Sequence, residues 1–325
     1  MRVAFFGSPA YAVPALEALD AAHDVVLVVT QPDAPAGRGM KLRTPPVAAR
    51  AAALGRPLAQ PSNLKRDAAF AATLRDAHAD VAVTVAYGKI LPASLLDVPP
   101  HGFLNAHASR LPQHRGAAPI QWALIQGDTE TAVTIMQTDP GLDTGPVRLV
   151  EPVAIHPDDT YPTLADRLAH ASADALVEAL DRLARGTLPS TPQDDAAATY
   201  APLLVKDDGA LDWTASATAI WNRFRGVIAW PGTRTRIAGT TLKIDALAPA
   251  STDARAADGA ADAAPGTVLR VDDGGVLVAC GDGAVRLERV TPAGKPSMPA
   301  ADWARGARVA PGDRADEVQG DAHRG

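Results

Sequence analysis

Two polar residues in the stretch NAHASRLPQHRGAAP, residues 105–119, have side chains and a spacing that suit acyl-transfer chemistry. Asn105 and His107 are two positions apart, so their side chains point to the same side of an extended strand. An Asn amide donates hydrogen bonds to a developing oxyanion, and a histidine gains and loses protons near neutral pH. The pair therefore suits transfer of an acyl-type carbon through a tetrahedral intermediate. By themselves, however, the two residues fit a strand-end cap beside a hydrogen-bonded histidine better than an active site.

A second stretch, DPGLDTGP at residues 139–146, adds carboxylates to this chemistry. Two glycines, two prolines and two aspartates predict a rigid loop after another strand. If Asp143 lies near His107, its carboxylate fixes the imidazole tautomer and favours the protonated ring. The alternative is an Asx-type turn with a solvated aspartate. The spacing alone does not decide whether Asp143 reaches His107.

The first half of the chain alternates short apolar runs with helical patterns. Strands are expected at residues 2–7, 24–31, 80–88, 103–107, 132–139 and 146–155, the last two as a hairpin. Helices are expected at residues 12–22, 47–55, 67–79, 118–127 and 160–186. Apolar strands separated by helices predict an α/β fold with a doubly wound, mostly parallel, Rossmann-like sheet. Asn105 and His107 then lie at the carboxyl end of a strand, where open α/β sheets bind ligands.

The pattern changes after Gly186. Residues 187–202 contain three prolines and no sustained periodicity, which is typical of a linker. One helical pattern at 216–227 is followed by short strand-like segments, which predict a small antiparallel, OB-like β-barrel. The predicted organisation is a catalytic domain at 1–187, a linker at 188–205, a barrel domain at 206–312 and a tail at 313–325.

Composition excludes several classes of protein. The single cysteine, Cys280, excludes an internal disulfide framework and fits a reducing compartment. No stretch approaches the roughly 20 apolar residues that cross a bilayer, and MRVAFFG at the start predicts a buried strand rather than a signal peptide. We therefore expect a cytoplasmic protein without a membrane partner. A net charge of −6 argues against general polyanion binding, although it permits a local basic patch.

Two cofactor classes are also disfavoured. The turn after the first strand has Gly7 but carries Pro9 where a dinucleotide fingerprint needs its second glycine, which argues against a nicotinamide cofactor. His101, His107 and His114 are irregularly spaced and lack a nearby cysteine pair, so no metal site is predicted.

The two loops together resemble the folate-dependent formyltransferases. The signature of that family is Asn-x-His-x-Ser-Leu-Leu-Pro, then Arg-Gly-x-x-Pro, then Gly-Leu-Asp-Thr-Gly, and this chain has NAHASRLPQHRGAAP and GLDTG. Collinear similarity extends from FFGSPAYAVPAL near the start through YAPLLVKDDGALDW to PAGKPSM near the end. Within the family, the chain resembles the group that formylates methionyl-tRNA.

The resemblance implies roles for individual residues. Asn105, His107 and Asp143 match the catalytic trio of the family, and Ser109, Arg110, Leu111 and Pro112 match its tetrahydrofolate-binding segment. Arg110 is a departure, because the family usually has leucine there. Residues 86–92 match a stretch that lines the pterin pocket, with Lys89 at a position that is commonly apolar, and we assign Lys89 no role.

The resemblance also implies the reaction and its partners. The expected co-substrate is 10-formyltetrahydrofolate, and the expected acceptor is initiator methionyl-tRNA, with the enzyme acting as a monomer. Arg38 and Lys41, in the Gly- and Pro-rich loop 30–46, and Lys206 are expected to contact tRNA. The arginines near Trp221 and Trp230 form either a basic face or scattered surface charges: Arg223, Arg225, Arg234 and Arg236. The main alternative function is formylation of a sugar nucleotide or another small amine with the same donor.

Overall fold

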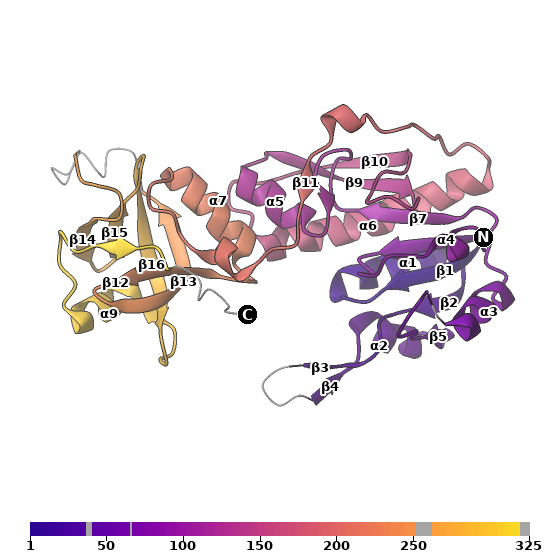
Figure 1. The fold of residues 1–325 in the computed structure, drawn as a ribbon, viewed down its shortest axis with the longest axis horizontal. Coiled ribbons are helices and arrows are strands. Elements are labelled where there is room, and N and C mark those ends of the chain that lie inside the picture. Colours follow the sequence, from indigo (N-terminus) through magenta and orange to yellow (C-terminus); the bar gives the residue numbers. More distant parts are fainter. Residues whose placement is uncertain (37–40, 66, 251–261, 319–325) are drawn as a thin grey trace. The chain divides into compact units, whose positions relative to one another are not determined.

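The computed structural model describes residues 1–36, 41–65, 67–250 and 262–318 (Figure 1). The chain divides into two compact units. The first unit comprises Met1–Ile120, Thr129–Pro157 and Thr163–Pro202, and the second comprises Gln121–Asp128, Asp158–Pro162 and the chain from Leu203 onward. The domain boundaries expected from the sequence stay predictions.

The first unit is built on a seven-stranded sheet with the strand order β10-β9-β7-β6-β1-β2-β5. Neighbouring strands from β7 to β5 are parallel, while β9 pairs antiparallel with both β7 and β10. The strands span Arg2–Gly7 (β1), Asp24–Val29 (β2), Leu58–Ala59 (β5), Val81–Val85 (β6), Phe103–His107 (β7), Glu130–Gln137 (β9) and Val147–Ala154 (β10). This arrangement confirms the mostly parallel α/β sheet and the hairpin formed by its last two long strands.

Helices bury the faces of this sheet. On one face, Ala4 and Phe6 of β1 form an apolar cluster with Phe70 of α3 and Leu95 of α4. The alternate residues of β1 point to the other face and are also fully buried, as expected for a doubly wound sheet. The helices of the first unit are α1 (Val13–Ala22), α2 (Pro46–Ala53), α3 (Ala68–Asp76), α4 (Ala93–Leu96) and, from Thr163 onward, α6 (Tyr161–Ala184). Helix α5 (Pro119–Gln126) spans the boundary between the two units.

Residues 30–46 are more regular than the single loop expected from the sequence. Strands β3 (Ala34–Ala36) and β4 (Lys41–Arg43) pair antiparallel, with Pro35 opposite Leu42. The Gly- and Pro-rich composition concealed this hairpin, because each strand has only three residues and is too short for a recognisable alternation. Arg38, which was expected to contact tRNA, lies outside the described residues.

The second unit is an antiparallel β structure with the strand order β14-β15-β16-β13-β12-β18. The two ends of this sheet approach each other, since Ala315 N donates to Gly266 O at 2.7 Å and Val268 N donates to Asp313 O at 2.8 Å. These hydrogen bonds give the small barrel-like form predicted from the sequence. Its elements are η3 (Lys206–Gly209), α7 (Ala217–Val227), β12 (Thr233–Ile237), β13 (Thr240–Pro249), β14 (Val268–Asp272), β15 (Gly275–Ala279), β16 (Ala284–Pro292), β17 (Met298–Pro299), α9 (Ala300–Ala307) and β18 (Ala315–Asp316).

The apolar interior of the second unit joins its helices to its strands. Phe224 of α7 and Trp303 of α9 belong to the same buried cluster as Val278 and Leu287. The sequence did not predict α9, because two helical turns of AADWARGA are too short for a periodic pattern to stand out. Within the described part of the chain, no helix is both long and apolar enough to cross a membrane.

Candidate active site

His107 lies at the carboxyl end of β7, between β6 and β9, with 6% of its surface exposed. Its Nε2 atom is 2.9 Å from the carbonyl oxygen of His114. A carbonyl oxygen only accepts hydrogen bonds, so Nε2 must carry the proton in this contact. Proton exchange at the imidazole is therefore left to Nδ1, which lies 3.7 Å from Oδ2 of Asp143.

Asn105 lies two residues before His107 on β7, and its side chain is oriented by the neighbouring strand β6. The hydroxyl of Thr84 donates to Oδ1 of Asn105 at 2.9 Å, and the two residues are register partners in the parallel pair. Because the amide oxygen is engaged, the amide N–H groups remain as the donors of this side chain. Thr84 is a site residue that sequence reasoning missed, since only the pairing of the two strands brings it to Asn105.

Asp143 is carried by a loop that connects β9 and β10. Its backbone has φ 54°, in the left-handed region, and its Oδ2 accepts a hydrogen bond from Gly116 N at 2.8 Å. The other aspartate of the loop, Asp139, makes the Asx-type turn by accepting from Gly141 N at 3.0 Å and from the Thr144 hydroxyl at 2.8 Å. The structure therefore gives the two carboxylates different roles and places Asp143 beside His107.

Gly145 allows this loop to return against β9. A Cβ atom at position 145 would lie 1.8 Å from the carbonyl oxygen of Gln137, which no side chain tolerates. The next residue, Pro146, accepts a hydrogen bond from Gln137 N at 2.9 Å and begins the approach to β10. Glycine at 145 is thus required by the path of the loop that carries Asp143.

The segment expected to bind folate is held by Thr134 of β9. The Thr134 hydroxyl donates to Ser109 O at 2.6 Å and accepts from Leu111 N at 3.2 Å. The Ser109 hydroxyl donates to Gln113 O at 2.6 Å, and the side chains of Ser109 and Leu111 are buried. The buried side chains of Ser109 and Leu111 thus stabilise the segment, and Pro112 is partly buried. The assignment of the segment to folate binding stays a prediction.

Two cations that depart from the family pattern are engaged in contacts with the protein itself. Arg110 Nη2 donates to Glu130 Oε1 at 2.5 Å in a partly exposed ion pair. Lys89 Nζ donates to the carbonyl oxygens of Pro61 and Ser62, each at 3.1 Å. Lys89 therefore anchors the chain around residues 61 and 62, which explains how a lysine is accommodated at this position.

The residues expected to contact tRNA are only partly described. Lys41 belongs to β4. Lys206, in η3 of the second unit, is exposed, and its carbonyl oxygen accepts a hydrogen bond from Arg234 Nη2 at 2.6 Å. Arg225 is only 5% exposed, and burial lowers the pKa of its guanidinium while the nearby Asp159 opposes that shift. Arg225 therefore does not belong to an exposed basic face with Arg223, Arg234 and Arg236.

Part of the segment predicted to be a linker also contributes to this site. The Gln193 amide donates to the carbonyl oxygens of Asp143 and Gly145, at 2.8 and 2.7 Å. Further along, the Thr199 hydroxyl accepts from His114 N at 2.8 Å. Strand β11 (Tyr200–Ala201) then pairs in parallel with β8 (Arg115–Gly116). Sequence reasoning missed these contacts because the segment carries no periodic pattern.

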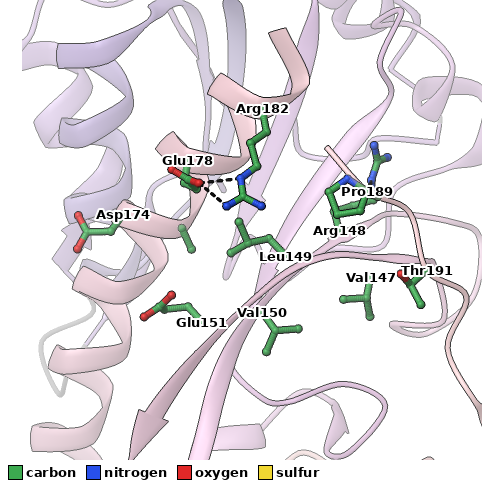
Figure 2. Close-up of a pocket in the computed structure, with 11 residues that line it drawn as sticks. Val147, Arg148, Leu149, Val150, Glu151, Asp174, Glu178, Arg182, Pro189 and Thr191 are labelled. Carbon is green, nitrogen blue, oxygen red and sulfur yellow. Dashed lines mark hydrogen bonds and ion pairs between the residues drawn. The ribbon is translucent and has the colours of Figure 1, made fainter. Parts of the chain in front are cut away.

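A separate cavity of about 620 Å³ is lined by residues of β10 and α6 (Figure 2). Its two arginines are engaged within the protein: Arg182 pairs with Glu178 at 2.6 Å, and Arg148 Nη1 donates to Gln137 Oε1 at 2.8 Å. None of the predicted catalytic or folate-binding residues lines this cavity. The candidate active site is therefore the group of residues around Asn105, His107 and Asp143.

Comparisons with known proteins identify the family of the chain. A family model of formyl transferases matches residues 1–180, and a model of the formyl transferase C-terminal domain matches residues 203–308. The chain belongs to the formyl transferase family.

Individual formyl transferases show how far the similarity extends. The methionyl-tRNA formyltransferase of Deinococcus radiodurans is 55% identical over 315 residues, which cover 97% of this chain and 96% of that protein. A methionyl-tRNA formyltransferase of Thermus thermophilus is 47% identical over 318 residues, covering 98% of this chain and all of that protein. The sequence similarity to these two proteins therefore covers both units of this chain.

The fold is also shared with a solved N-formyltransferase of low sequence identity. An N-formyltransferase from Helicobacter canadensis, solved with folinic acid and dTDP-3-aminofucose, has a TM-score of 0.65 and 15% identity, covering 88% of this chain and 98% of that one. At this identity, the likeness shows the fold alone.

Proposed function

We propose that the protein transfers the formyl group of 10-formyltetrahydrofolate to the α-amino group of methionine on initiator tRNA, producing N-formylmethionyl-tRNA for translation initiation. The observation that carries this proposal is the 55% identity to a methionyl-tRNA formyltransferase along 97% of the chain. Because the identity spans the second unit as well as the first, it supports the acceptor and not only the formyl chemistry. The folate donor is a co-substrate, and the proposed chemistry requires no metal.

The proposed reaction begins when the neutral amine attacks the formyl carbon. The carbonyl oxygen becomes an oxyanion, and the Asn105 amide, whose oxygen is held by Thr84, presents N–H groups to it. His107 contributes through Nδ1, because His114 engages Nε2. A pre-oriented donor of this kind contributes about 10²- to 10³-fold to the rate.

The second half of the proposed reaction breaks the bond between the formyl carbon and N10 of the folate. The attacking amine must lose one proton and N10 must gain one, so the reaction needs a group that accepts and returns a proton. Asp143 and the Nδ1 atom of His107, 3.7 Å apart, form such a pair. We assign the proton transfers to this pair, with Asp143 also orienting the imidazole.

The segment formed by Ser109, Arg110, Leu111 and Pro112 is proposed to contact the folate, with Arg110 contributing its backbone because its guanidinium pairs with Glu130. Arg38, Lys41 and Lys206 are proposed to contact tRNA. For Lys206, the supporting observation is an exposed lysine beside Arg234 in the second unit. One chain supplies all three members of the catalytic trio, so we propose that the enzyme acts as a monomer. The proposed acceptor places it in the cytoplasm, where translation begins.

Formyl transfer assays on three acceptors test the proposal. The donor is 10-formyltetrahydrofolate, and the acceptors are methionine charged on initiator tRNA, free methionine and a UDP-amino sugar. Transfer is expected only to the charged tRNA, and Asn105→Ala and His107→Ala should each lower kcat by about 10²-fold or more. Transfer to the sugar nucleotide instead would support the assigned active site but contradict methionyl-tRNA as the acceptor. Absence of transfer to every acceptor would contradict the enzymatic function.

A further inference from the structure

The Gln193 side chain spans the turn that carries Asp143. Its Nε2 donates to the carbonyl oxygens of Asp143 and Gly145, at 2.8 and 2.7 Å. Those two carbonyls bracket residue 144, so a single amide group holds both sides of the turn. The turn needs such support, because Asp143 has φ 54° and non-glycine residues are strained in that region.

Arg115 fixes the orientation of that amide. Its Nε and Nη2 atoms donate to Gln193 Oε1 at 3.1 and 2.8 Å, and Nη2 also donates to Asp195 Oδ1 at 2.7 Å. A guanidinium has no acceptor, so Gln193 must present its oxygen to Arg115 and its N–H groups to the turn. Arg115 is only 2% exposed, and a buried guanidinium requires partners of this kind.

The same short stretch of chain contacts the other members of the site. The carbonyl of His114 accepts from His107 Nε2, and Gly116 N donates to Asp143 Oδ2 at 2.8 Å. Residues 114–116 therefore contact the imidazole, the Gln193 amide and the Asp143 carboxylate in succession. A displacement of Arg115 or Gln193 would be transmitted directly to the distance between His107 and Asp143.

We propose that Gln193, held by Arg115, is a positioning residue that keeps the Asp143 carboxylate in place beside His107. Gln193 contacts the backbone of the Asp143 turn rather than the reacting atoms, so it acts through Asp143. The expected loss of kcat rests on the proposed function. The expected effect on the turn at residues 139–146 is independent of that function. The structural alternative is that Gln193 serves only as a hydrogen-bond partner for the buried Arg115.

Two substitutions separate these roles. Gln193→Ala removes both the contact to Arg115 and the contacts to the turn. Gln193→Glu keeps an acceptor for Arg115, and adds a charge that suits a guanidinium, but it presents a carboxylate oxygen to the carbonyls of Asp143 and Gly145. If Gln193 positions the turn, both variants lose activity, whereas a role confined to Arg115 leaves Gln193→Glu active.

The kinetic test compares these variants with wild type and with Gln126→Ala, an exposed glutamine on α5. Formyl transfer to charged initiator tRNA is expected to show kcat lowered about 10- to 100-fold in Gln193→Ala and Gln193→Glu. The KM values for donor and acceptor should stay within threefold, because neither substrate contacts Gln193 in the proposal. Full activity of Gln193→Glu, or a loss expressed only in KM, would overturn the proposal.

A double substitution tests whether Gln193 acts through Asp143. When the carboxylate is already absent, as in Asp143→Asn, its position no longer matters, so adding Gln193→Ala should change kcat by less than about threefold. Multiplication of the two single effects would show that Gln193 acts independently of Asp143 and would overturn the proposal.

Hydrogen exchange of the backbone amides tests the structural part without any activity. Exchange in peptides covering 139–146 is expected to accelerate in both Gln193 variants and to stay unchanged in Gln126→Ala. Absence of formyl transfer by the wild type would contradict the proposed function. Unchanged exchange in the Gln193 variants would separately contradict the proposal that Gln193 holds the turn at residues 139–146. Thermal unfolding identifies a variant that is globally destabilised, and Gln193→Glu, which retains a partner for Arg115, is the variant expected to fold like wild type.

Discussion

The Nε2 atom of His107 lies 2.9 Å from the carbonyl oxygen of His114, which commits one of the two imidazole nitrogens to a backbone contact. The other nitrogen, Nδ1, faces the Asp143 carboxylate at 3.7 Å. This separation is longer than a direct hydrogen bond, so the two side chains are close but not hydrogen-bonded to each other. The chemistry assigned to the imidazole thus depends on the carboxylate that faces it.

Replacing Asp143 with Asn removes the charge and keeps the size of the side chain. The amide oxygen can still accept from Gly116 N, so the turn is expected to stay folded. Because the group that exchanges protons with His107 is lost, kcat for formyl transfer should fall by about 10²- to 10³-fold with little change in either KM. Steady-state kinetics with both substrates measures this effect, and a loss of less than threefold would remove Asp143 from the proton transfer.

Replacing Arg110 with Leu, the residue usual in the family, should have little effect. Arg110 pairs with Glu130 at the surface, and a partly exposed ion pair contributes about 1 kcal/mol or less. The KM for 10-formyltetrahydrofolate is therefore expected to change by less than about twofold. Glu130→Gln, which breaks the same pair from the other side, is the matched control. A tenfold change in KM for Arg110→Leu alone would show that the guanidinium contacts the folate.

Local patterns in the sequence were sufficient to predict the sheet and the position of Asn105 and His107 on it. The strand FLNAH was expected at residues 103–107 and is observed as Phe103–His107, because an apolar run bounded by turn signals is a local feature. A polar pair at its carboxyl end then follows from the general position of ligand sites in open α/β sheets. The contact between His107 and Asp143 depends instead on the path of a loop, and only the family resemblance indicated it.

The supports of the trio were not predictable from local patterns. Arg115 and Gln193 are 78 residues apart, and Gln193 lies in a proline-rich stretch whose composition resembles a linker. Thr84 reaches Asn105 because β6 and β7 pair in a particular register. Such contacts are set by tertiary packing, on which residue types and periodicity carry no information.

Replacing Gly145 with Ala should disable the turn that carries Asp143. The added Cβ would lie 1.8 Å from the carbonyl oxygen of Gln137 at the end of β9, so the turn must shift away from that strand. We expect a loss of stability of about 1–3 kcal/mol together with a loss of kcat of at least tenfold. Denaturant unfolding and steady-state kinetics measure the two effects. Gly306→Ala, in helix α9 where a Cβ meets no atom within 4 Å, is a control for glycine substitution without a clash.

Replacing Tyr87 with Phe should make the protein more resistant to alkaline unfolding. Burial raises the pKa of the Tyr87 phenol to about 12, and its ring packs against Phe6 with centroids 5.4 Å apart. A pKa raised in the folded state contributes stability that is complete below about pH 10 and is lost as the pH rises toward 12. The free energy of unfolding should therefore fall less between pH 9 and pH 11 in Tyr87→Phe than in wild type. Tyr200→Phe, at an exposed ring, is the matched control, and identical pH dependence of wild type and Tyr87→Phe would contradict the prediction.

Replacing Lys206 with Ala should weaken the use of tRNA and leave the use of folate unchanged. Its side chain is exposed, and the Arg234 guanidinium bound to its carbonyl oxygen places a second positive charge nearby. If Lys206 neutralises one phosphate, the logarithmic dependence of tRNA affinity on salt concentration should become shallower by about 1. Binding of charged initiator tRNA across a salt series measures this slope, with Lys65→Ala, another exposed lysine, as the charge-matched control. An unchanged slope with an unchanged KM for tRNA would show that the ammonium of Lys206 does not contact the acceptor.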